Sequence, residues 1–178
     1  MRSSSYTPSQ KLLHWLIFLL VIGLYALTYG EDIFPRGDPR RDTAWWLHIS
    51  FGLALFGLVA VRVAMRLAYG APELPASMSE LERNLAKVAH LALYLLLVAI
   101  PVLGIWLTWL RGDALTFFGW FTVPSPVTPD RELAHTIKEV HGVLANIILA
   151  VVALHAVAAL LHHFVRKDDV LKRMLPGG

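Results

Sequence analysis

Four stretches of the chain are almost continuously apolar, at residues 12–29, 45–65, 88–110 and 140–163. Each has about the 20 residues that a helix needs to cross ~30 Å of bilayer hydrocarbon at ~1.5 Å per residue. A helix of a soluble core would carry polar side chains every few positions, and these stretches carry very few. The pattern therefore predicts an all-α fold with a single domain over residues 1–178, built as a four-helix transmembrane bundle.

The composition agrees with this pattern and removes several kinds of chemistry. Hydrophobic residues make up 56% of the chain, and the mean hydropathy of +0.56 lies above the range of soluble proteins. The chain has no cysteine, which excludes disulfides, iron–sulfur clusters, thiolate catalysis and the covalent attachment of a c-type haem. Any redox role therefore needs a cofactor that is held by histidine or bound without a covalent link.

The first apolar stretch has an alternative interpretation as a cleaved signal peptide, because a basic N-terminus precedes it. It lacks a clear small-x-small cleavage site, and it contains His14 and Trp15. We therefore expect this stretch to be retained as the first membrane span.

The charges of the loops predict how the bundle lies in the membrane. If both termini are cytoplasmic, ten Lys and Arg residues lie on the inner side and six on the outer side, in agreement with the positive-inside rule. The ten are Arg2, Lys11, Arg62, Arg66, Arg83, Lys87, Arg166, Lys167, Lys172 and Arg173; the six are Arg36, Arg40, Arg41, Arg111, Arg131 and Lys138. The pI of 9.4 then reflects anchoring to the lipid surface, and we see no sign of nucleic-acid binding.

Two connecting segments have recognisable local patterns. Ser79 followed by Glu82 resembles a capping box and predicts that a helix starts ahead of the third span. The segment between the third and fourth spans is the longest, and we expect its aromatic residues to fold back onto the outer end of the bundle. These residues are Phe117, Phe118, Trp120 and Phe121, while Trp45, Trp46, Trp106 and Trp109 fit an aromatic belt at the outer ends of the spans.

The histidines divide into two depths, because successive spans alternate in direction. His14 opens the first span on the inner side, whereas His48 and His141 open the second and fourth spans on the outer side. His155 follows His141 by 14 residues, which places it ~21 Å deeper and within ~40° of the same helix face. The expected pairs are His14 with His155 and His48 with His141. Two facing imidazoles at each of two levels suit a pair of bis-histidine haems.

Three alternatives compete with this interpretation. A membrane histidine can simply hydrogen-bond to a neighbouring helix, so that the protein would be a structural bundle without haem. A zinc site would gather three or four ligands at one level, and a proton relay would normally include carboxylates at mid-depth. The four histidines divide two and two, and no Asp or Glu lies within the apolar stretches. The division into pairs favours haem over zinc, and the missing carboxylates disfavour a proton relay. A structural bundle would require all four histidines to be incidental.

Other polar residues lie at the levels of the two pairs. His90 and His162 are candidates for a quinone pocket on the inner side, with an interfacial position facing lipid headgroups as the alternative. His163 is expected to face headgroups, and His135 is expected to be exposed in the outer loop. Arg62 and Lys138 are possible partners for the propionates of the inner and outer haem, although Arg62 could equally be an inner-surface anchor. Arg36, Arg40, Arg41 and Lys138 are the outer cations that could attract an anionic substrate.

Several segments together resemble the bacterial cytochrome b561 family over nearly the full length. They are "KLLHWLIFLLVIGLYAL", "IFPRGDPR", "VAHLALYLLLVAIPVLGI", "VHGVLANI" and "LHAVAALLHHFVRKDDVLKRMLP". The histidine spacing and the last of these segments are specific, whereas apolar runs alone would not be.

This resemblance implies a multi-pass cytochrome of the bacterial inner membrane with two non-covalent b haems. The haem irons would be held by His14 with His155 and by His48 with His141. The implied activity is that of a superoxide:ubiquinone oxidoreductase, which oxidises superoxide to dioxygen on the periplasmic side and passes electrons through the haems to ubiquinone. Such a protein requires no protein partner. The alternative is a cytochrome b subunit that relays electrons within, and anchors, a larger dehydrogenase or hydrogenase complex.

Overall fold

Four long helices dominate the computed structural model, which describes residues 5–176 with the side chains of residues 30–32 excepted. Their bounds are Pro8–Ile33 for α1, Pro39–Tyr69 for α2, Glu80–Arg111 for α3 and Arg131–Leu161 for α4. All four are long and apolar enough to cross a membrane, so the four-helix transmembrane bundle is confirmed. Only 6–17% of the residues in their most apolar windows are buried inside the bundle, because lipid rather than protein covers the rest. The cytoplasmic location of both termini stays a prediction; below, "inner" names the end of the bundle near the two termini, and "outer" names the opposite end.

The helices extend beyond the apolar stretches because polar residues cap them outside the hydrocarbon. Ser79 forms the predicted capping box with Glu82 at the start of α3. Asp38 and Asp130 cap α2 and α4 in the same way, by accepting backbone N–H groups of the first turn. A hydrogen bond from Arg40 also lowers the pKa of the Asp38 carboxyl below its usual value.

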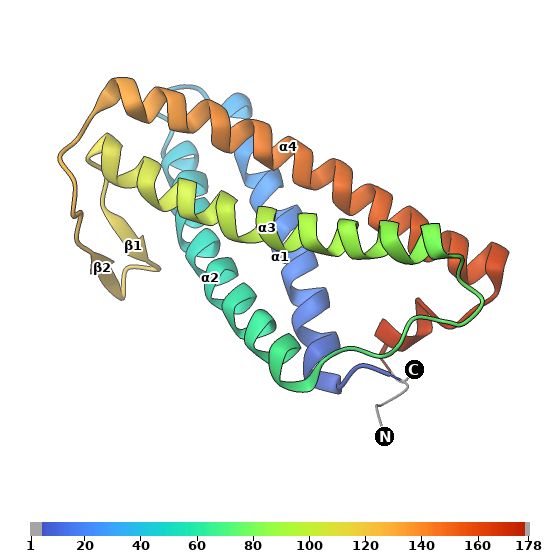
Figure 1. Ribbon diagram of the computed structural model, residues 1–178. Coiled ribbons are helices and arrows are strands. Elements are labelled where there is room, and N and C mark those ends of the chain that lie inside the picture. Colours follow the sequence, from blue (N-terminus) through green and yellow to red (C-terminus); the bar gives the residue numbers. More distant parts are fainter. Residues whose placement is uncertain (1–4, 177–178) are drawn as a thin grey trace.

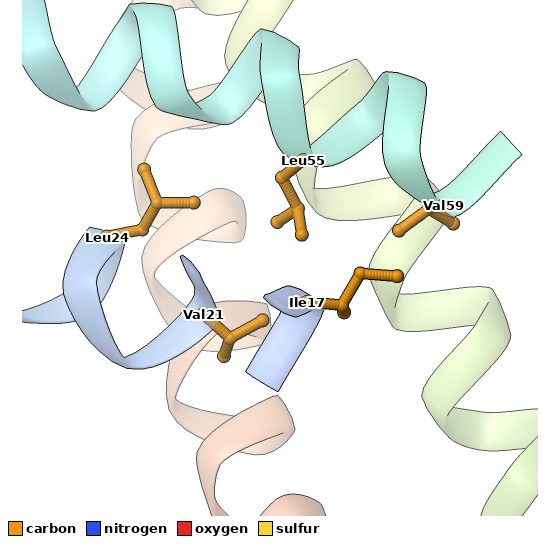
Figure 2. Packing of buried hydrophobic residues seen from close by; sticks show 5 residues of the cluster. All are labelled: Ile17, Val21, Leu24, Leu55 and Val59. Carbon is orange, nitrogen blue, oxygen red and sulfur yellow. The ribbon is translucent and has the colours of Figure 1, made fainter. Parts of the chain in front are cut away.

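The bundle consists of two helical hairpins, α1 with α2 and α3 with α4, and α2 also packs on α3 (Figure 1). Within the first hairpin, Ile17, Val21 and Leu24 of α1 face Leu55 and Val59 of α2 (Figure 2). Helices in lipid gain little from the hydrophobic effect, so close contact between such branched side chains holds this pair together.

A second apolar cluster joins the outer halves of α3 and α4. Leu107 and Leu110 of α3 pack there against Ala134 and Ile137 of α4. Each hairpin therefore has its own tightly packed contact, and the two hairpins meet chiefly through α2 and α3.

A small β-hairpin lies between α3 and α4 at the outer end, where the sequence predicts only an aromatic loop (Figure 1). Its strands, β1 (Leu115–Phe117) and β2 (Phe121–Val123), are antiparallel. Phe118 and Gly119 form the turn with φ values of 48° and 74°, and two positive φ angles match the twist of a tight hairpin. Strands of three residues are too short to show a period-2 pattern, so the sequence does not reveal them.

Ser50 of α2 fastens this hairpin to the bundle. Its Oγ donates to the Thr116 carbonyl at 3.3 Å and accepts the Phe118 N–H at 3.1 Å, and the residue is fully buried. The rings of Trp46 and Phe51 pack against Phe118. The predicted return of the aromatic segment onto the outer end of the bundle is therefore confirmed.

The chain beyond α4 turns back across the inner end of the bundle. A π-helical turn at His162–Arg166 follows α4, and a 3-10 turn covers Lys172–Met174. Lys11 Nζ donates to the Leu175 carbonyl and Trp15 Nε1 to the Met174 carbonyl, both at 3.0 Å. Residues 162–176, which we call the C-terminal segment, thus contact the first turns of α1.

Two ion pairs further order the C-terminal segment. Arg166 pairs with Glu82 at the start of α3. Arg173 bonds Asp169 at 2.9 Å, which lowers the pKa of the Asp169 carboxyl. The segment therefore connects both helical hairpins at the inner end.

Replacing Ser50 by Ala should release the outer β-hairpin without disturbing the helices. The substitution leaves the Phe118 N–H without its acceptor, at a cost of about 1–3 kcal/mol. Hydrogen–deuterium exchange of residues 113–124 in detergent should become faster. Ser79→Ala is the matched control, because it removes a helix cap at the inner end and should leave this segment protected. Equal protection of the segment in wild type and Ser50→Ala would contradict the role of Ser50.

Candidate functional site

The structure brings the four membrane histidines together in the two predicted pairs. The rings of His14 on α1 and His155 on α4 have centroids 6.2 Å apart and planes at 76°. The rings of His48 on α2 and His141 on α4 have centroids 6.3 Å apart and planes at 64°. We call these the inner pair and the outer pair. Each pair joins the first helical hairpin to α4.

The spacing of both pairs suits a metal between the rings. A metal–imidazole bond is about 2.0–2.1 Å, as for zinc, and the ring centroid lies roughly 1 Å behind the bonded nitrogen. Two such ligands on opposite sides of one metal therefore have centroids about 6 Å apart, close to the 6.2 and 6.3 Å observed. Both separations also lie within the 4.5–7 Å that is usual for edge-to-face ring pairs, so the spacing accommodates a metal without requiring one.

A cavity of about 400 Å³ surrounds the outer pair. Both His48 and His141 line it, together with apolar side chains of all four helices. Gly52 and Gly142, next to these histidines on α2 and α4, also line the cavity, and a Cβ on either would meet open space. The cavity thus offers a largely apolar space beside the outer rings, as a haem requires.

The orientations of the outer rings are set by other elements of the fold. His48 Nδ1 donates to the Leu24 carbonyl of α1 at 3.1 Å, which leaves Nε2 as the nitrogen with a lone pair. A ligating histidine typically donates its other ring N–H in this way. The His141 ring rests on α3, where a Cβ on Gly104 would lie only 3.2 Å from its Cε1. Its Nδ1 is buried and makes no hydrogen bond of normal geometry with the described residues.

The inner pair has further polar neighbours. The His90 ring of α3 lies 5.4 Å from the His155 ring, and its Nδ1 donates to the Ala86 carbonyl at 2.6 Å. Arg62 donates to the Gln10 carbonyl at 2.9 Å, one turn before His14. His90 and Arg62 therefore lie at the inner level, as predicted from their positions in the sequence.

His162 is held by the C-terminal segment. Its Nδ1 lies 2.6 Å from Asp168 Oδ2, and both side chains are largely buried, with 15% and 12% exposed. The partner is within reach because the π-helical turn and a left-handed Lys167 bring the chain back on itself. Sequence reasoning missed Asp168, since a π-turn has no clear sequence signal.

The remaining histidines differ in exposure. His135 is exposed, as predicted, but it lies in the first turns of α4 and not in the outer loop. His163 is half-buried, and its Nδ1 is shielded from solvent with no hydrogen-bond partner among the described residues. Its ring packs against Phe164 rather than projecting freely toward headgroups.

The predicted outer cations lie in two different settings. Lys138 lines the outer cavity, as expected from its place before His141. Arg40 forms an ion pair with Asp38 at 2.7 Å and lies over the Phe34 ring, and Arg41 donates to the Phe34 carbonyl at 3.3 Å. The charge of Arg40 is therefore largely balanced by Asp38 within the first outer loop, and we do not retain Arg40 among the cations that attract an anionic substrate.

Three contacts near the outer pair were missed by sequence reasoning. Trp45 stacks on His48 with centroids 5.6 Å apart and planes at 5°, and the Arg111 guanidinium lies over the Trp45 ring at 5.1 Å. The three-residue spacing of Trp45 and His48 on one helix was the available signal. Tyr25 donates to Asn146 Oδ1 at 2.8 Å, which links α1 to α4 beside the cavity.

Comparison with known proteins identifies similar chains that match this one over most of their length. A family model described as prokaryotic cytochrome b561 matches residues 5–177. A protein of Yersinia pestis named probable superoxide oxidase CybB is 37% identical over 174 residues, which cover 96% of each chain. The proteins named cytochrome b561 homolog 1 and homolog 2 of Escherichia coli (strain K12) are 33% and 36% identical. They match 96% and 91% of this chain and 97% and 86% of their own.

Replacing Gly104 by Ala should disturb the outer pair selectively. The new Cβ would press on the His141 ring from 3.2 Å, so the ring has to move by a few tenths of an ångström. The absorbance and electron paramagnetic resonance signals of haem bound at the outer pair should shift, while those of haem at the inner pair stay unchanged. Gly57→Ala on α2 is the control, because a Cβ there meets nothing within 4 Å. Identical spectra of the two variants would contradict the contact between α3 and His141.

Proposed function

The chain belongs to the prokaryotic cytochrome b561 family of membrane haem proteins, and on this premise we propose that it transfers electrons from superoxide to ubiquinone through two haems b. Family membership and four apolar helices make it a multi-pass, haem-containing electron-transport protein of the bacterial inner membrane. Both the resemblance and the location predicted from the sequence are thereby confirmed, and the family supports an oxidoreductase role.

The observation that carries the proposal is the presence of two separate histidine pairs, each with the spacing of two ligands on one metal. His14 and His155 would hold one haem, and His48 and His141 the other. When bound, haem supplies an iron that accepts and releases one electron at a time. Because both pairs include a histidine of α4, 14 residues apart, they would hold the two groups in a line across the membrane at ~21 Å of axial rise.

The cavity at the outer pair supports a small anionic donor on that side. Lys138 lines this cavity and would pair with a carboxylate of the outer haem or attract the donor. The relative in Yersinia pestis carries superoxide oxidase in its name. Two superoxide ions would each give up one electron, and two molecules of dioxygen would leave.

The inner end offers polar groups for a quinone acceptor. Ubiquinone would take up the two electrons together with two protons. His162 donates from Nδ1 to Asp168, so Nε2 is the atom that would hold a proton for the quinone, and the carboxylate would stabilise the resulting imidazolium. His90 would line the same pocket, and Arg62 would hold a carboxylate of the inner haem while it stays bonded to Gln10.

Replacing one histidine of either pair by Ala should remove one haem and leave the other. His48→Ala should abolish the signals of the outer haem and His155→Ala those of the inner haem, since an iron with one axial protein ligand is held much less tightly. A pyridine haemochrome assay and absorbance at liquid-nitrogen temperature would measure both effects. His135→Ala is the control, because this histidine is exposed on the same helix as His155. Two intact haems in either pair variant would refute the ligand assignment.

The substrates are tested on the purified holoprotein in detergent. Superoxide from xanthine oxidase should reduce the haem absorbance bands, and a ubiquinone analogue should reoxidise them. Superoxide dismutase should abolish the reduction, which controls for other donors in the mixture. Haem that dithionite reduces and superoxide does not would refute the superoxide proposal and favour an electron-relay subunit of a larger complex.

A further inference from the structure

Arg111, Trp45 and His48 form a continuous stack at the outer end of the bundle. The Arg111 guanidinium carbon lies 5.1 Å from the Trp45 ring, and the Trp45 ring lies 5.6 Å from the His48 ring with nearly parallel planes. Trp45 and His48 belong to the start of α2, and Arg111 is the last residue of α3. The stack therefore leads from the end of a neighbouring helix directly to the outer pair.

Arg111 has no carboxylate partner among the described residues, in contrast to the other cation placed over an aromatic ring. Arg40 lies over Phe34 but is paired with Asp38 at 2.7 Å. Among the described residues, Arg111 forms no ion pair and no hydrogen bond through its side chain. A guanidinium over the face of an indole is stabilised by the ring while its N–H donors remain available for an anion.

Trp45 connects this cation to the outer pair. The indole is partly exposed and also lines the outer cavity. Its neighbour Trp46 is more exposed, at 40%, yet contacts Phe118 of the β-hairpin rather than a histidine. Only the first of these two adjacent tryptophans therefore offers a ring-to-ring path to His48.

We propose that Arg111 and Trp45 form the docking surface for a small anionic one-electron donor, and that the electron reaches the outer pair through the stacked rings of Trp45 and His48. This inference rests on the proposed haem at the outer pair and names the surface where its donor binds. The donor would lose one electron, and a haem held by His48 and His141 would accept it. Trp45 is not oxidised; its π-system lowers the barrier to tunnelling, and no bond or proton changes place.

The test compares five single variants of the holoprotein in detergent: Trp45→Leu and Arg111→Gln, the matched controls Trp46→Leu and Arg40→Gln, and Trp45→Phe. Haem reduction is followed by stopped flow with three donors: superoxide, the sulfur dioxide radical anion from dithionite, and the cationic hexaammineruthenium(II). Haem content and absorbance maxima are measured first, so that rates are compared between variants with two intact haems.

Trp45→Leu should slow reduction by both anionic donors about tenfold, which corresponds to about 1.4 kcal/mol of activation free energy. Trp45→Phe, which keeps an aromatic ring, should recover most of that loss, and Trp46→Leu should behave as wild type. If Trp45→Leu loses the outer haem, its reduction rates are not used. The reduction rates of Trp45→Phe and Arg111→Gln then test the proposal. Equal rates in Trp45→Leu and Trp46→Leu would overturn the path through Trp45.

Arg111→Gln should slow the anionic donors about three- to tenfold at low ionic strength and speed the cationic one. These differences should shrink in ~1 M salt, where charges are screened over about 3 Å. The midpoint potential of the outer haem should fall, because a nearby positive charge favours the reduced form, and Arg40→Gln should change neither quantity. If Arg111→Gln matches Arg40→Gln in rate and potential, the docking surface is refuted.

The three donors separate this inference from the proposed function. If superoxide fails to reduce the wild-type haems while the dithionite radical shows the expected effects of Trp45 and Arg111, the docking surface stands and superoxide is the wrong donor. If both anions reduce wild type and no variant differs from its control, superoxide oxidation stands and the docking surface is refuted.

Discussion

The structure depends on a constraint that lipid imposes on imidazole. A polar ring gains nothing from hydrocarbon, so each histidine within a span needs a partner that the bundle supplies. α1 and α2 pack together through branched apolar side chains, as do α3 and α4, but α1 and α4 make little direct contact. The two histidine pairs and the Tyr25–Asn146 hydrogen bond join the first hairpin to α4, and Leu149 of α4 adds an apolar contact with the α1–α2 cluster. The rings that need partners thus add to the α2–α3 contact through which the two hairpins meet.

Much of this arrangement follows from the sequence, because a membrane helix has few degrees of freedom. Its rise and turn per residue are constant, so the depth of His155 below His141 and their shared face follow from the 14 residues between them. The partners His14 and His48 then follow from the alternation of span direction. The start of α3 is equally predictable, since the Ser79 capping box is local in sequence.

The features that the sequence did not predict all depend on contacts between segments that meet only when the chain folds back on itself. The Asp168 partner of His162 requires a π-turn and a left-handed Lys167, two conformations that are uncommon at such residues. The position of Arg111 over Trp45 depends on how α3 ends beside α2, which no local pattern encodes. The β-hairpin is held by Ser50, a residue 66 positions away from the carbonyl it binds. Such long-range contacts are decided by packing and not by periodicity.

α4 contributes one histidine to each pair, and this has a mechanical consequence. Because one continuous helix carries both His141 and His155, the separation of the two sites is set by covalent and hydrogen-bonded geometry. Tilting of α1 or α2 in a thinner or thicker bilayer would change the gap between the rings of a pair, but not the distance from one pair to the other. If two haems are held as proposed, the span between them would therefore be insulated from changes in the surrounding lipid, while the affinity for each would remain sensitive to such changes.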